Sequence, residues 1–183
     1  METKKGQIGL LFFLATEVMF FAGLFSAYWV LRAQTGEWPP VGQPRLPVLV
    51  TGINTVILLL SAVAIWRADA AQKKGCHLCL VGWLGLTGVG GLLFLGIQGY
   101  EWMRLIQFGL TTARNIYGGI FYMIVGAHGV HVIAALIVLL VVFLKAVRYR
   151  YAETNKTGLV LFQIYWTFVV LLWPVIYVAI YLL

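Results

Sequence analysis

Five long apolar runs constrain the fold of this chain more than any other feature of its sequence. They cover residues 8–32, 48–66, 78–100, 117–144 and 159–183. A helix needs about 20 mostly apolar residues to cross the hydrocarbon core of a bilayer, so each run is long enough to span it. The sequence therefore predicts an all-α, polytopic membrane protein in which residues 1–183 form a single membrane domain of five helices.

The composition leaves no room for a soluble domain. Hydrophobic residues make up 62% of the chain and charged residues 10%, whereas about a quarter of the residues in an average soluble domain are charged. Few residues remain outside the five runs. Any function must therefore lie within or between the predicted helices.

The basic residues are distributed unequally between the two sides of the predicted membrane domain. One side carries nine of them, at 4, 5, 67, 73, 74, 145, 148, 150 and 156, and the other carries four, at 32, 45, 104 and 114. Because cytoplasmic loops are enriched in Lys and Arg, the nine-residue side is predicted to be cytoplasmic. The N terminus is then cytoplasmic and the C terminus lies outside. This bias explains most of the net charge of +7, and we expect no nucleic-acid partner.

A carboxylate interrupts the first apolar run. Glu17 lies nine residues after Ile8, which places it about 13 Å into the apolar layer. An ionised group at such a depth costs at least about 2.5 kcal/mol unless it is paired, neutral or shielded by protein. We therefore expect Glu17 to have a partner on another helix.

Histidines in the fourth run are the candidate partners of this carboxylate. His128 and His131 are three residues apart and so lie on one side of the predicted helix. Counted from Lys145, His131 is about 21 Å deep and His128 about 25 Å, so His131 is closer to the depth of Glu17. An imidazole and a carboxylate can share one proton as a charged or as a neutral pair. The sequence does not distinguish these two forms.

No metal site, cofactor site or catalytic centre is predicted within this chain. Cys76 and Cys79 have the spacing of half a zinc site, but the sequence has no second pair of ligands to complete it. We expect two incidental, reduced thiols at a helix start, since the predicted location is cytoplasmic. His128 and His131 share a helix and His77 lies in a loop, which argues against a haem with two histidine ligands.

The third run has a repeated glycine spacing and a polar end. Its glycines recur every three residues, at Gly82, Gly85, Gly88 and Gly91. They favour close helix packing, although a groove for a lipid or cofactor is an alternative. Near the end of the run, Gln98 and Glu101 lie one turn apart, and we expect a polar pair there with Arg104 close by.

Four segments together resemble subunit III of the haem-copper oxidases, in its short, five-helix form. They are LLFFLATEVMFFAGLFSAYW, INTVILLLSAVAIWRA, IQGYEW and YGGIFYMIVGAHGVHVIAALI, and the likeness covers nearly the whole chain. The resemblance implies an accessory, non-catalytic subunit of a proton-pumping terminal oxidase in the bacterial inner membrane. It implies contact with subunits I and II, bound phospholipids, and haems and copper held by those partner subunits.

The resemblance also implies roles for individual residues. Glu17 resembles the family's buried carboxylate that reacts with hydrophobic carbodiimide, and His131 resembles its neighbouring histidine. Lys145 stands where the family often has an arginine that binds lipid phosphate. Arg148 and Arg32 are further candidates for contact with lipid headgroups.

The last helix departs from the family pattern. The family commonly has a histidine and an aspartate in the segment Y-W-H-F-V-D-x-x-W, and this chain has Thr167 and Val170 at those places. Polar contacts that other members make through this helix are therefore not expected here. The departure suggests a divergent branch of the family, and a larger respiratory supercomplex is a candidate partner.

Other functions remain open from the sequence. The chain could be the equivalent subunit of a quinol oxidase or of a nitric oxide reductase system. Two further classes are a purely structural scaffold, in which Glu17 only ties two helices together, and a small proton channel that uses Glu17 and His131. The absence of an internal repeat in the sequence argues against a transporter.

Overall fold

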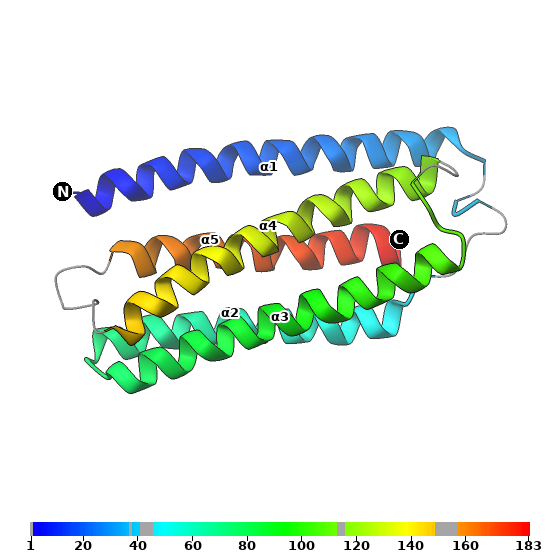
Figure 1. The fold of residues 1–183 in the computed structure, drawn as a ribbon. Coiled ribbons are helices and arrows are strands. Elements are labelled where there is room, and N and C mark those ends of the chain that lie inside the picture. Colours follow the sequence, from blue (N-terminus) through cyan, green and yellow to red (C-terminus); the bar gives the residue numbers. More distant parts are fainter. Residues whose placement is uncertain (1, 37, 41–45, 113–115, 149–156) are drawn as a thin grey trace.

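Long helices, joined by short connections, lie side by side along nearly the whole chain. The computed structural model describes residues 2–36, 38–40, 46–112, 116–148 and 157–183. Its helices are α1 (Glu2–Gln34), α2 (Val48–Lys73), α3 (His77–Gln107), α4 (Ile116–Val147) and α5 (Thr157–Tyr177), and α5 continues into a short π-helix, η1 (Val178–Leu182) (Figure 1).

The predicted fold class is confirmed. Five helices are long and apolar enough to cross a membrane, and no strand occurs in the described ranges. The first four predicted runs lie inside α1 to α4, and the fifth falls on α5 and η1. The helices extend beyond the apolar runs because their polar ends continue the backbone hydrogen bonding past the bilayer core.

The two termini lie at opposite ends of the bundle, as an odd number of spans requires (Figure 1). Which end faces the cytoplasm stays a prediction. Four of the basic residues behind that prediction, Arg45, Arg114, Arg150 and Lys156, lie outside the described residues, as does Pro44 of the first connection.

Helices α2 and α3 form a tight antiparallel pair. Gly75, with φ of 70°, turns the chain between them, a conformation that favours glycine. Further along, a Cβ atom on Gly90 would lie 2.8 Å from Cβ of Ser61. Asn54 on α2 donates a hydrogen bond to the backbone oxygen of Phe94 on α3, over 3.1 Å. Gly90, which lies outside the repeated glycine spacing of this helix, therefore allows α2 and α3 to approach closely.

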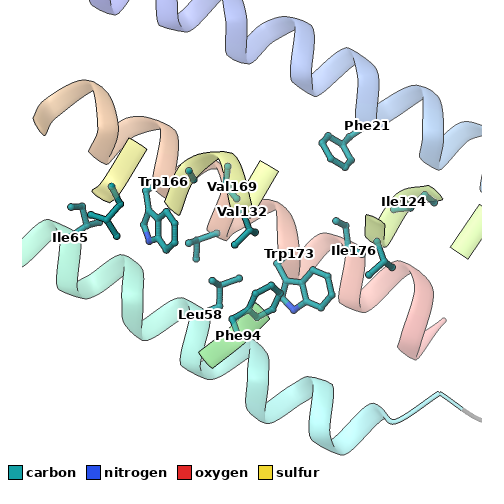
Figure 2. Packing of buried hydrophobic residues seen from close by; sticks show 14 of the residues in the cluster. Phe21, Leu58, Ile65, Phe94, Ile124, Val132, Trp166, Val169, Trp173 and Ile176 are labelled. Atoms are coloured by element: carbon teal, nitrogen blue, oxygen red, sulfur yellow. The ribbon is translucent and has the colours of Figure 1, made fainter. Parts of the chain in front are cut away.

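The core lies where α5 meets α2, α3 and α4. Trp166 and Trp173 of α5 are fully buried there among Leu58, Phe94 and Val132 (Figure 2). Each indole N–H has an acceptor on α2, since Trp166 donates to Ser61 over 3.2 Å and Trp173 donates to Thr55 over 2.9 Å. These bonds satisfy the polar atoms that the buried indoles carry into an apolar interior.

Helix α1 is attached to the rest of the bundle along a narrow seam. Among its described side chains the buried ones are Leu14, Phe21 and Tyr28, which recur every seven residues, and the helix packs mainly on α4 and α5 (Figure 1). A seven-residue repeat is the pattern of a helix that presents one stripe to its neighbours. Most other apolar side chains of α1 are exposed.

The connection after α1 is anchored by an aromatic contact. Trp38 donates a hydrogen bond to the Tyr28 hydroxyl over 3.1 Å. Its ring also meets Tyr117 of α4 edge to face, with ring centres 5.0 Å apart. The peptide bond between Trp38 and Pro39 is cis. Through Trp38, the described part of this connection is therefore held against α1 and α4.

Candidate functional site

Glu17 and His131 form an ion pair or hydrogen bond between α1 and α4. Oε2 of Glu17 lies 2.8 Å from Nε2 of His131. The two side chains are only 15% and 17% exposed. Glu17 is one turn from both Leu14 and Phe21, so it belongs to the seam of α1 that faces the bundle. The structure thus brings together the two residues that depth along the membrane had paired.

Nδ1, the second ring nitrogen of His131, is also hydrogen-bonded, and this limits where protons can lie in the pair. Nδ1 of His131 lies 2.7 Å from the backbone oxygen of Ala127, one turn earlier on α4. Because a carbonyl oxygen can only accept, Nδ1 must carry a hydrogen. Nε2 then either accepts a proton from a neutral Glu17 or donates its own to an ionised one. In both forms a single proton lies between the two side chains.

Aromatic rings of α1 enclose the imidazole of His131. The ring of Phe21 meets it edge to face at 5.4 Å, and the ring of Phe20 lies 6.4 Å from it. These apolar neighbours exclude water from part of the pair. In such surroundings an orphan charge on either residue is costly, which favours a direct contact between the two side chains.

His128 does not take part in this pair. It is fully buried between the rings of Phe94 and Trp173, at 6.0 and 5.0 Å. Residues three apart on a helix point about 60° away from each other, so His131 faces α1 while His128 faces α3 and α5. Neither ring nitrogen of His128 has a hydrogen-bond partner in the part of the chain that the structure describes.

The three candidate lipid contacts lie at opposite ends of the bundle. Lys145 and Arg148 are exposed near the end of α4. Arg32 is near the other end, where it donates to the backbone oxygen of Leu183 and its guanidinium lies 5.2 Å from the ring centre of Trp29. The structure does not bring these three cations into one site.

Cys76 and Cys79 differ from the sequence-based expectation of two free thiols. The structure joins them in a disulfide, with Cα atoms 5.3 Å apart. Cys76 directly precedes α3 and Cys79 lies one turn later. One helical turn therefore separates the two residues by a distance that a disulfide can bridge. Between them, Nε2 of His77 lies 2.8 Å from the backbone oxygen of Ala146 and links α3 to the end of α4.

The polar residues at the far end of α3 are arranged differently from the predicted pair. Gln98 donates to the hydroxyl of Tyr181 over 3.3 Å. Glu101 instead forms an ion pair with Arg104, at 3.5 Å. Both Gln98 and Glu101 are buried. The expected proximity of Arg104 is confirmed by its ion pair with Glu101, whereas Gln98 does not pair with Glu101 and its observed partner comes from η1.

His131 of α4 is not free to ligate a haem. Both ring nitrogens of His131 are engaged, by Glu17 and by Ala127. His128 is enclosed by the rings of Phe94 and Trp173. The described residues also contain no group of three or more His, Cys, Asp and Glu side chains placed to hold a metal ion.

The fold and the site together define a class of protein: a five-helix, multi-pass membrane protein with a buried carboxylate–histidine pair joining its first and fourth helices. Comparison with known proteins narrows this class. The family described as cytochrome c oxidase subunit III matches residues 1–183. The chain therefore belongs to the cytochrome c oxidase subunit III family.

Individual relatives support the same assignment. The chain is 36% identical to cytochrome c oxidase subunit 3 of Synechocystis sp., over 97% of this chain and 75% of that protein. It is 37% identical to the subunit 3 of Thermostichus vulcanus, over 96% of this chain and 86% of the relative. Membership makes the chain part of an oxidase complex of the respiratory chain, associated with other oxidase subunits.

Proposed function

We propose that this chain is a non-catalytic accessory subunit of a proton-pumping cytochrome c oxidase in a bacterial inner membrane. In this role it stabilises the complex, binds lipids and supports proton uptake by subunit I. The observation that carries the proposal is the contact of 2.8 Å between Glu17 and His131, which holds one proton between two spanning helices.

The surface of α1 supports contact with other subunits or with lipid. Apolar side chains such as Phe12, Met19 and Val30 are exposed along it. An apolar face of this length is stable only against lipid or against another spanning helix. Subunits I and II are the proposed protein partners, and a larger respiratory supercomplex is the proposed wider assembly. Phospholipid headgroups would contact Lys145, Arg148 and Arg32.

The redox cofactors belong to the partner subunits in this proposal. The histidines of this chain are engaged or enclosed as described, so haems and copper would lie elsewhere in the complex. The names of the relatives favour cytochrome c as electron donor over the alternatives of a quinol oxidase or a nitric oxide reductase system.

Two variants of Glu17 separate proton exchange from helix attachment. Glu17→Gln keeps the size of the side chain, and its amide can still donate to Nε2 of His131, but the shared proton is lost. Glu17→Leu removes both the proton and the hydrogen bond. We expect Glu17→Gln to assemble normally while proton uptake per assembled complex slows several-fold and inactivation during turnover becomes faster. We expect Glu17→Leu also to lower the assembly yield.

The control is Asp69→Asn, because Asp69 forms its ion pair with Lys73 near the end of α2 and not with His131. It should leave both measurements unchanged. If Glu17→Gln matches the wild type in proton uptake and in inactivation, and only Glu17→Leu lowers assembly, the pair is a structural tie alone. If the isolated chain conducts protons in vesicles and Glu17→Gln abolishes this, the chain is a channel and the accessory role is wrong.

A further inference from the structure

A second site lies between α3 and α4, away from the Glu17 contact. It is a pocket of about 270 Å³. Three glycines contribute to its wall, Gly99 on α3 and Gly126 and Gly129 on α4, and their missing side chains leave the space open. No charged residue lines the pocket. An occupant would therefore be uncharged, since a net charge without a partner is strongly disfavoured at this depth.

Three residues that line this otherwise apolar pocket carry buried polar atoms without partners. His128, Gln98 and Trp102 all belong to its wall. Both ring nitrogens of His128, Oε1 of Gln98 and Nε1 of Trp102 lack a hydrogen-bond partner among the described residues. His128 is 0% exposed and Gln98 is 4% exposed. Buried polar groups in native proteins nearly always have a partner, so these atoms point to a ligand.

The hydrogen-bonding character of these atoms defines the polar part of the ligand. Oε1 of Gln98 can only accept, and Nε1 of Trp102 can only donate, while a neutral His128 does one of each. A single group that donates once and accepts twice can engage Oε1 of Gln98, Nε1 of Trp102 and the N–H of His128, and it leaves the second ring nitrogen of His128 without a partner. A hydroxyl group has this property, whereas a carbonyl or an ester leaves Gln98 without a donor.

The rest of the wall defines the apolar part of the ligand. The rings of Phe94, Trp102 and Trp173 line the pocket, and Phe94 meets Trp173 edge to face at 4.9 Å. A further flat ring can extend such an aromatic cluster. At the rim, Val130 and Ile133 are exposed on the surface that faces lipid or a partner, so a hydrocarbon tail can leave the pocket between them.

We propose that this pocket binds a neutral amphiphile with a hydroxyl-bearing ring and a hydrocarbon tail, of the phenol or quinol class. The hydroxyl contacts His128, Gln98 and Trp102, and the ring lies among the aromatic side chains. The site does not depend on the proposed role of Glu17. His131 faces α1 and contacts Glu17, whereas His128 faces α3 and α5.

Two matched photoreactive probes test this site in the purified complex that contains the full-length chain, held in lipid nanodiscs. One probe is a 4-alkylphenol with a diazirine in its tail, and the other is the same alkylbenzene without the hydroxyl. Labelled residues are located by mass spectrometry. We expect the phenol to label the segments around Gly99 and Gly129 several-fold more than the alkylbenzene does.

Variants of the wall sharpen the test. Gly99→Leu fills the pocket, and a Cβ atom on Gly99 meets no other atom within 4 Å, so the helix can accept it. Gly96→Leu is the matched control, since a Cβ atom there is equally free and Gly96 does not line the pocket. Trp102→Phe keeps an aromatic ring and removes the N–H donor.

The preference for the phenol should disappear in Gly99→Leu and persist in Gly96→Leu. Trp102→Phe should reduce phenol labelling about two- to tenfold, which is the effect of one neutral hydrogen bond, and leave alkylbenzene labelling unchanged. Equal labelling by both probes in the wild type would overturn the proposal and indicate a pocket that holds water or lipid tails. Unchanged phenol labelling in Gly99→Leu would place the probe elsewhere and also overturn it.

Discussion

Glycines of α3 that look alike in sequence have different environments in the structure. A Cβ atom on Gly91 would lie 2.6 Å from Trp166 and 2.8 Å from Leu136. Gly85 and Gly88 instead line an apolar groove of about 340 Å³ between α3 and α4. From the sequence, close helix packing and a groove for a lipid or cofactor were alternatives for the glycines that recur every three residues. The structure contains both, because α4 and α5 approach α3 closely at Gly91 and leave space further along.

Gly91→Ala should destabilise the protein, because the added methyl group overlaps two side chains in a packed core. We expect a loss of about 1–3 kcal/mol in the free energy of unfolding. Gly96→Ala adds the same group where no atom lies within 4 Å, and its effect should stay within about 0.5 kcal/mol. Reversible unfolding of both variants in mixed detergent micelles measures the difference. Equal stability of the two variants would contradict the packing described for Gly91.

The element that distinguishes this bundle is α1, which has few buried contacts for its length. Its seam consists of Leu14, Phe21 and Tyr28, with Glu17 between the first two. Where side chains face lipid instead of water, burial of apolar area contributes little, and packing and hydrogen bonds hold helices together. The seam and the contact with His131 therefore provide most of the attachment of α1.

Phe21→Ala should loosen α1 specifically. The Phe21 side chain is 1% exposed and meets the His131 ring, so its removal leaves a cavity on the seam. Such a truncation costs about 3 kcal/mol in a packed core. Phe12→Ala is the control, because Phe12 is 72% exposed. Hydrogen exchange should become faster in the amides of α1 for Phe21→Ala alone. Faster exchange throughout all five helices would instead indicate global destabilisation.

At the scale of the whole molecule, the charges at the two ends of the bundle are unequal. One end has the start of α1 and α3 and the end of α2 and α4, with the described cations Lys4, Lys5, Arg67, Lys73, Lys74, Lys145 and Arg148. The other end has Arg32 and Arg104 among the described residues. The positive-inside rule therefore predicts the first end to be cytoplasmic.

Reporter fusions test this orientation in cells. Alkaline phosphatase fused after Leu183 should be active, because the enzyme folds only outside the cytoplasm, and green fluorescent protein fused there should be dark. The same two reporters inserted at Gly75, in the turn between α2 and α3, should give the opposite result. A fluorescent C-terminal fusion together with active phosphatase at Gly75 would show that the orientation is reversed.

Sequence alone was sufficient for the features that depend on local chemistry and on the bilayer. Apolar runs of spanning length predict helices, because backbone groups in lipid must be satisfied within the helix. The depth of Glu17 in the first run indicated His131 as its partner, since the depths of both residues can be measured from the same membrane surface. The structure shows the same five helices and the same contact.

Tertiary structure decided the features that depend on how the helices are rotated and spaced. The bond from Nδ1 of His131 to Ala127, the enclosed ring of His128 and the pocket beside Gln98 could not be read from residue spacing. Each of them arises where side chains from different helices meet. Depth in the membrane determines which residues can be neighbours, and the rotation of each helix about its axis determines which of them are.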